Sequence, residues 1–120
     1  MIDITDQIVD ICREVVGKAY RTWPQKSPKD PYAVVSKIGH MVEQADRDGS
    51  EVRVRLTYSV SVLAPKPSEA QDLTMLIGDR LAAINFHTTG YSDTYEEPNH
   101  LYRANVTVDG AVDRRGDTFF

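Results

Sequence analysis

The sequence predicts an α+β fold: a two-layer sandwich with two helices packed on one face of a mainly antiparallel sheet of four to five strands. Residues 4–16 and 68–84 have apolar side chains at helical spacing, whereas residues 51–63 alternate strictly between apolar and polar side chains. The expected element order is α-β-β-β-α-β-β. We assign it to a single domain over residues 1–111, followed by a polar C-terminal tail over residues 112–120.

The composition is that of an ordinary globular domain. The chain has 120 residues, of which 41% are hydrophobic and 27% charged, and its formal net charge is −4. We expect no specific nucleic-acid recognition, because that function depends on clustered Lys and Arg side chains. We also expect no membrane partner, since no apolar run approaches the ~18 residues that a membrane span requires.

The first element is predicted to be an amphipathic helix over residues 4–16. Asp3 or Thr5 can cap its start, and Gly17 is a suitable residue to end it. Its apolar stripe comprises Ile4, Ile8, Val9, Ile11, Cys12, Val15 and Val16. Because Cys12 is the only cysteine and lies on this stripe, we expect a buried structural thiol rather than a nucleophile.

Residues 18–31 interrupt the pattern with three prolines and several basic residues around Tyr20 and Trp23. Prolines at this density oppose helix and inner strand, so we expect a short extended piece over residues 19–23 and then a loop. Aromatic and basic side chains together can stack on single-stranded nucleic acid. Without a basic groove we favour the alternative, in which the two aromatic rings pack on the domain or meet a neighbouring subunit.

Two strands should follow. Residues 31–38 are rich in β-branched side chains, and residues 41–49 lose the apolar rhythm and end in the turn sequence Asp-Arg-Asp-Gly. The alternation over residues 51–63 then predicts a strand of about 40 Å, roughly twice the usual length. One of its faces is apolar; the other is polar and basic, carries Arg53 and Arg55, and should be open.

The second helix and a final hairpin complete the domain. Ser68 and Gln71 have the spacing of a capping box at the helix start. The predicted buried stripe of this helix comprises Ala70, Leu73, Ile77, Leu81 and Ile84. Residues 91–95 and 101–108 should form two antiparallel strands that turn through Glu96-Glu97-Pro98-Asn99.

We predict no catalytic, cofactor-binding or metal site, and therefore a protein that is not an enzyme and needs no cofactor. His40, His87 and His100 do not lie at metal-ligand spacing from one another or from Cys12. The adjacent acids near residues 46–48 and 96–97 are typical of solvated turns. No phosphate-binding glycine loop or nucleophile motif is present in the sequence.

The predicted architecture instead favours a role in assembly. A one-sided sheet leaves its second face to solvent or to another chain, and a long strand exposes backbone edges. The candidate contact residues are Tyr20, Trp23, Arg53, Arg55, Arg114, Arg115, Phe119 and Phe120. The alternative is a monomer whose long strand is bent or bulged and whose polar face is simply hydrated.

An amphipathic first helix, the strand Pro31-Tyr32-Ala33-Val34-Val35, the long strand Val52 to Leu63, the helix entry Ser68-Glu69-Ala70 and a closing strand near Val108 follow one another. This pattern, which covers roughly Asp3 to Val108, resembles the small tail-terminator and tail-completion (neck) proteins of long-tailed bacteriophages and related prophages. The family has no invariant motif from which individual functional residues can be transferred.

The resemblance implies a ring, commonly a hexamer, that caps the tail tube at its head-proximal end and joins it to the filled head. Its implied partners are further copies of itself, the tail-tube protein and a head-connector protein, and the free subunit can be monomeric before assembly. The implied location is the virion tail or neck, after assembly in the host bacterial cytoplasm. Two alternatives stay open: another head–tail connector or baseplate component, and a small ferredoxin-like enzyme or ligand-binding domain.

Overall fold

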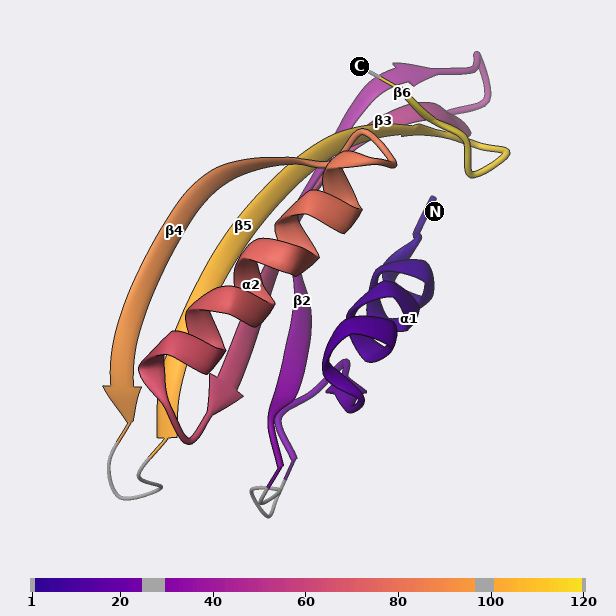
Figure 1. Cartoon of the computed structure of the whole chain (residues 1–120). Helices are drawn as coiled ribbons and strands as arrows, with labels where there is room; N and C mark the ends of the chain where they lie inside the picture. The colour runs from indigo at the N-terminus through magenta and orange to yellow at the C-terminus, as the bar shows by residue number, and fades with distance from the viewer. Residues whose placement is uncertain (1, 25–29, 97–100, 120) are drawn as a thin grey trace.

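The computed structural model, which describes residues 2–24, 30–96 and 101–119, is an α+β sandwich with both helices on one face of the sheet (Figure 1). The elements are α1 (Thr5–Val16), β1 (Ala19–Tyr20), β2 (Tyr32–Ala45), β3 (Glu51–Ala64), α2 (Pro67–Ala82), β4 (His87–Glu96), β5 (Leu101–Asp113) and β6 (Thr118–Phe119). The strand order is β1-β2-β3-β5-β4, with β6 added to β5, and only β1 and β2 run parallel. The predicted fold class and element order are confirmed.

The first helix forms as its apolar stripe predicts. Ile8 and Cys12 are fully buried, and burial raises the pKa of the Cys12 thiol to about 12. The predicted cap is wrong: the N-cap residue is Ile4, which makes no side-chain cap, rather than Asp3 or Thr5. Asp3 Oδ1 instead accepts a hydrogen bond from the backbone N–H of Thr5, the first residue of the helix, at 2.9 Å. Gly17 ends the helix with φ of +98°, a left-handed conformation that glycine adopts without strain.

The strand β2 is longer than predicted. The sequence assigned residues 41–45 to a connection, but β2 continues to Ala45 and pairs with β3 along its whole length. Ile38 and Glu43 are bulged residues that have no partner in the β3 register. Each bulge shifts the side-chain alternation by one position, which explains why the periodicity of the sequence fails there.

The second helix differs from its prediction at both ends. The capping box of Ser68 and Gln71 is wrong: the helix begins one residue earlier at Pro67, and no side chain caps it. Proline suits this position, because its fixed φ is helical and its missing N–H would have no intrahelical acceptor. Ile84 lies beyond the helix, and Thr74 rather than Leu73 is fully buried, with its hydroxyl donating to the Ala70 carbonyl at 2.7 Å.

The last two strands also extend beyond the predicted residues 91–95 and 101–108. A bulge between Thr88 and Gly90 and the glycine at 110 interrupt the alternation, so the outer parts of both strands lacked a pattern. The predicted turn from Glu96 to Asn99 lies mostly outside the described residues.

The polar tail predicted from residue 112 begins inside β5. Residues 112–113 are still part of that strand, and the chain then turns back so that Thr118 pairs with Val112 in β6. The described part of the tail is therefore integrated into the sheet.

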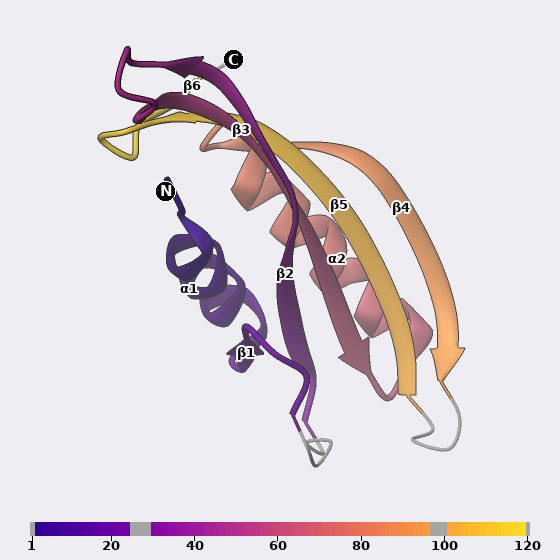
Figure 2. The ribbon, with the colours of Figure 1, turned by 180° about the vertical axis from the view of Figure 1, so that it is seen from behind.

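The main core lies between the sheet and the two helices. On β3 every second residue is fully buried toward the helices: Val54, Leu56, Tyr58, Val60 and Val62. Phe86, in the connection after α2, packs against Tyr58 with the ring centroids 5.9 Å apart. The opposite face of the sheet, seen from behind in Figure 2, is not covered by either helix.

Candidate interaction surface

The uncovered side of the sheet, called the open face below, carries side chains from the central strands β3 and β5 and from Glu43 of β2. On β3 it comprises Arg53, Arg55, Thr57, Ser59, Ser61 and Leu63, and on β5 Arg103, Asn105, Thr107 and Asp109. These residues point away from the helices because they alternate with the core positions of the same strands. The open face has a charged end, a polar centre and an aromatic end.

The charged end is a network of alternating charges across β2, β3 and β5. Glu43 lies 3.4 Å from Arg53 Nε and 3.5 Å from Arg55 Nε, and Arg55 Nη1 lies 3.5 Å from Asp109 Oδ2. All four side chains are partly buried. The second oxygen of Asp109 is buried and has no hydrogen-bond partner among the described residues, so this carboxylate can still accept a hydrogen bond.

The polar centre is a ladder of hydrogen bonds between β3 and β5. Asn105 Oδ1 accepts from the hydroxyls of Ser59 and Ser61 at 2.8 and 2.9 Å. Arg103 Nη2 donates to the Ser61 hydroxyl at 3.1 Å. These hydrogen bonds orient the Asn105 side chain so that its carbonyl oxygen faces the serines of β3.

The aromatic end is formed where the segment after β1 passes over the sheet. The Tyr20 and Tyr32 rings meet edge to face with centroids 6.0 Å apart. The Arg103 guanidinium lies 4.8 Å from the centre of the Trp23 ring, a cation–π contact. Both aromatic side chains of the proline-rich segment thus pack against their own sheet, and 45% of Trp23 remains exposed.

The structure places the candidate residues in separate groups. Arg53 and Arg55 lie at the charged end of the open face, and Tyr20 and Trp23 lie at its aromatic end. A third group, Arg114 and Arg115, lies in the turn after β5, where Arg114 pairs with Asp46 at 2.6 Å. Phe119 belongs to β6, but its side chain and all of Phe120 lie outside what the structure describes.

Four residues that complete the open face are not among the candidate contact residues predicted from the sequence. Arg103, Asn105 and Asp109 alternate with the apolar residues of β5, and this pattern was a usable signal. Glu43 gave no such signal, because it occupies a bulge in a segment assigned to a connection.

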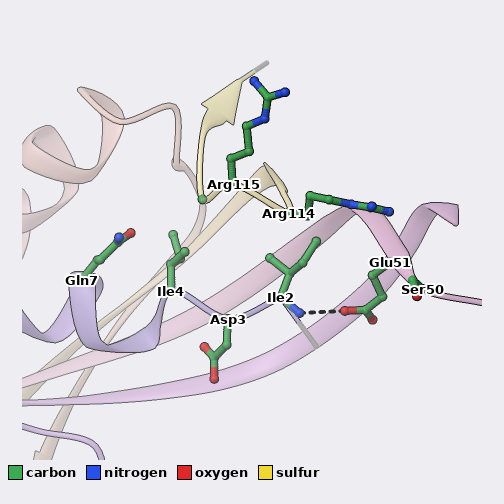
Figure 3. A pocket seen from close by; sticks show the side chains of 9 residues that line it. Ile2, Asp3, Ile4, Gln7, Ser50, Glu51, Arg114 and Arg115 are labelled. Carbon is green, nitrogen blue, oxygen red and sulfur yellow. Dashed lines mark hydrogen bonds between the residues drawn. The ribbon is translucent and has the colours of Figure 1, made fainter. Parts of the chain in front are cut away.

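A depression of about 610 Å³ lies beside the start of α1 (Figure 3). It is lined by Ile2, Asp3, Ile4, Gln7, Ser50, Glu51, Arg114, Arg115 and Gly116. Glu51 accepts a hydrogen bond from the Ile2 backbone N–H at 2.7 Å, and its other oxygen lies 2.6 Å from His40 Nε2. These two hydrogen bonds hold the pKa of Glu51 below its usual range. One oxygen ties the N-terminal segment to the sheet, and the other links β3 to His40 of β2.

A buried polar contact lies beneath the same helix start. The Tyr58 hydroxyl donates to Asp3 Oδ1 at 3.2 Å, and the Thr5 hydroxyl also contacts both groups. Burial raises the pKa of Tyr58 to about 12, which keeps its hydroxyl protonated as a donor. The arrangement is that of a satisfied internal network that anchors α1 on β3.

The described residues contain no group of three or more His, Cys, Asp or Glu side chains that could hold a metal ion. His40 contacts Lys37 and Glu51, His87 is exposed on β4, and His100 lies outside the described part. Over those same residues, no helix is both long and apolar enough to cross a membrane.

No protein-family model matches this sequence, and neither does any curated protein. Function is therefore inferred from the geometry of the chain and from the pattern of its sequence.

Proposed function

We propose that this protein is a ring-forming structural subunit of a bacteriophage or prophage tail neck, of the tail-terminator and tail-completion kind that its sequence pattern resembles. The observation that supports this proposal is the open face of the sheet. It combines a partly buried charge network, a polar ladder and a half-exposed tryptophan on one side of a domain whose core lies on the other side.

The chemistry of the open face suits a protein partner. Tryptophan, tyrosine and arginine supply most of the binding energy in protein interfaces, and Trp23, Tyr20 and Arg103 lie together at the aromatic end. At the charged end, two arginines are matched by Glu43 and Asp109. This balance leaves no excess positive charge for phosphate groups at the charged end, which favours a polypeptide over a nucleic acid there.

Ring formation requires two different surfaces on each subunit, one for each neighbour. The partners of such a ring are further copies of the same chain, the tail-tube protein on one side and a head-connector protein on the other. Another neck or baseplate component would use the same kind of surfaces and would differ only in its position in the tail.

A small ligand-binding domain or enzyme is the second candidate, because a 610 Å³ depression has the size of many small-molecule sites. Neither this depression nor the smaller one between α2 and β4 is lined by a histidine. A tightly bound metabolite in the purified protein, displaced by substitution of Gln7 or Ser50, would favour this candidate over assembly.

The test compares two variants that change the charge by the same amount. Ser59→Lys adds a positive charge in the middle of the open face, whereas Asp10→Asn removes a negative charge from the exposed side of α1. We expect sedimentation velocity and electron microscopy to show ring-sized species, free in solution or on the ends of tail tubes, for the wild type and Asp10→Asn, but not for Ser59→Lys. Identical unfolding midpoints would show that all three chains fold.

Genomic context provides an independent test. We expect the coding sequence to lie among genes for capsid and major tail proteins. A chain that stays monomeric at high concentration, forms no contacts with tail-tube protein and is encoded outside such a cluster would overturn the proposal.

A further inference from the structure

A groove lies between α2 and β4, on the side of the sheet that the helices cover and therefore away from the open face. Met75 and Gly78 of α2 and Thr88 of β4 line it, and the buried Val106 of β5 lies at its bottom. Its volume is about 240 Å³. This is below the range of about 300–1,000 Å³ that is typical of small-molecule sites, so the α2–β4 groove suits a single long side chain.

Gly78 sets the width of the α2–β4 groove. A Cβ at this position would lie 3.4 Å from the Thr88 hydroxyl oxygen, which is van der Waals contact distance. An alanine would therefore fit without displacing β4, but its methyl group would occupy part of the groove. Glycine leaves this space open, although it is a weaker helix former than alanine.

The charge of the α2–β4 groove is negative. Among the described residues that line it, the one charged side chain is that of Asp79. Neither Asp79 nor the acids that precede it on the same helix, Glu69 and Asp72, form an ion pair within the described part of the chain. The basic residue of α2, Arg80, is already paired with Glu14 of α1 at 3.4 Å. The carboxylate of Asp79 is thus available to a cation from outside.

Most of the remaining lining is apolar. Met75, Ala82 and Val106 provide apolar surface, and 66% of Met75 is exposed. A methylene stem is stabilised by contact with such surface, and a positive charge at the end of the stem is stabilised by the carboxylate. Lysine and arginine are the side chains that combine a long stem with a positive charge.

We propose that the α2–β4 groove is a docking site for a lysine or arginine side chain of a partner polypeptide, with the methylene stem against Met75 and the charged head beside Asp79. The inference rests on the proposed function, since a neck subunit binds proteins other than itself, and it names the chemistry of one such partner. Glu69 and Asp72 extend the negative charge along α2. A partner with further basic residues beside the inserted one is therefore attracted more strongly.

The partner is a different protein and not a second copy of this chain. Most Lys and Arg side chains of the described residues already form ion pairs within the chain: Arg13, Lys18, Arg21, Arg53, Arg55, Arg80 and Arg114. The whole chain also has a net charge of −4, so two copies repel each other on average. A basic protein has the free cations that the groove accepts.

A pair of short peptides tests the site directly. The probe is a blocked leucine-lysine-leucine peptide, and its control contains Nε-acetyl-lysine, which keeps the stem but removes the charge. In NMR titrations, we expect the lysine peptide to shift the backbone amide signals of Gly78, Asp79 and Thr88 more than other signals. We expect it to bind about three- to fivefold more tightly than its control, as for an ion pair that solvent partly screens. Equal binding of the two peptides, or shifts centred elsewhere, would overturn the inference.

Substitutions on α2 locate the site more closely. Asp79→Asn keeps the size of the side chain and removes its charge, whereas Gly78→Ala keeps the charge and narrows the groove. We expect both to weaken binding of the lysine peptide. Asp72→Asn makes the same charge change on the same helix but outside the lining, so it is the matched control and should have a smaller effect. A loss for Asp72→Asn as large as that for Asp79→Asn would overturn the inference, because the peptide would then follow the charge of the helix and not the groove.

The inference and the proposed function fail separately. Loss of the lysine peptide from Asp79→Asn with normal ring formation supports a partner other than a second copy, whereas loss of rings in this variant would overturn that assignment. Failure of the lysine peptide to bind the wild type, with rings that form normally, would overturn the docking site alone. Binding of the peptide at the groove of a chain that never forms rings would overturn the proposed function and leave the docking site intact.

Discussion

The two faces of β3 differ in what they contribute to the molecule. On the helix-covered face, five alternate residues from Val54 to Val62 are fully buried. On the open face, Arg53, Arg55 and Ser59 remain partly exposed and contact other polar side chains of the sheet. The buried residues on the covered face of β3 thus contribute mainly to stability, whereas the polar residues on its open face are available to contact a partner.

The energies of the two faces follow from their chemistry. Fully burying a Val, Leu or Phe side chain contributes about 1.5–3 kcal/mol, so the covered face supplies most of the stabilisation. Partly exposed ion pairs contribute about 0–1 kcal/mol each, because solvent screens them and holding the side chains costs entropy. Changes on the covered face should therefore reduce stability, and changes on the open face should mainly affect association.

The largest expected effect is at Phe86, which is fully buried and packs on Tyr58 from the covered side. We expect Phe86→Ala to reduce the free energy of unfolding by about 3–5 kcal/mol, through lost burial and the cavity left behind. Denaturant unfolding followed by circular dichroism measures this loss. Phe86→Leu, which keeps most of the apolar volume, is the control; a loss as large as that of the alanine variant would contradict the packing argument.

Substitutions at two glycines, one on each face, compare how tightly the two faces are packed. A Cβ on Gly110 would lie 2.9 Å from both the Asn85 carbonyl oxygen and the Phe86 ring on the covered side. A Cβ on Gly90, which pairs with Thr107 of the open face, would meet that side chain at an ordinary 3.9 Å. We expect Gly110→Ala to cost about 1–3 kcal/mol and Gly90→Ala to cost little, as measured by thermal unfolding. Equal costs would show that the faces do not differ in packing.

Among the polar residues of the open face, Asn105 is the one whose loss should cost most. It accepts two hydroxyl hydrogen bonds, so we expect Asn105→Ala to reduce the free energy of unfolding by about 1 kcal/mol. Asn105→Asp keeps the acceptor and should retain more of the stability. A loss comparable to that of Phe86→Ala would contradict the division of roles between the faces.

The fold could be predicted from the sequence where the spacing of apolar side chains stays constant along a whole helix or strand. The alternation over residues 51–63 located β3 and both of its faces, and the helical spacing over residues 4–16 located α1. Where a bulge shifts the period, as at Ile38 and Glu43, the pattern stops although the strand continues. Phe86 is in the core but stands in a short connection, where no neighbouring apolar residues form a pattern with it.

The open face could be predicted only in part for a related reason. Its β3 residues follow from alternation, but their neighbours depend on strand order, which brings Asp109 of β5 and Glu43 of β2 to the two arginines. Strand order is set by long-range contacts that one strand's sequence does not contain. The position of Trp23 over Arg103 likewise depends on how the segment after β1 crosses the sheet.

The smallest expected effect concerns Glu51, outside both faces. Hydrogen bonds from the Ile2 backbone N–H and from His40 lower its folded-state pKa below the usual 4.5. A carboxylate with a lowered folded pKa stabilises the fold above its unfolded pKa, and this stabilisation is lost as pH falls through the folded pKa. We expect Glu51→Gln to be less stable than the wild type near pH 7, and the difference in unfolding free energy to shrink as pH falls below 4.5. Glu14→Gln, which alters an exposed ion pair on α1, is the control and should show a smaller change. A difference that stays constant from pH 7 to pH 3 would mean that the charge of Glu51 does not hold the N-terminal segment on the sheet.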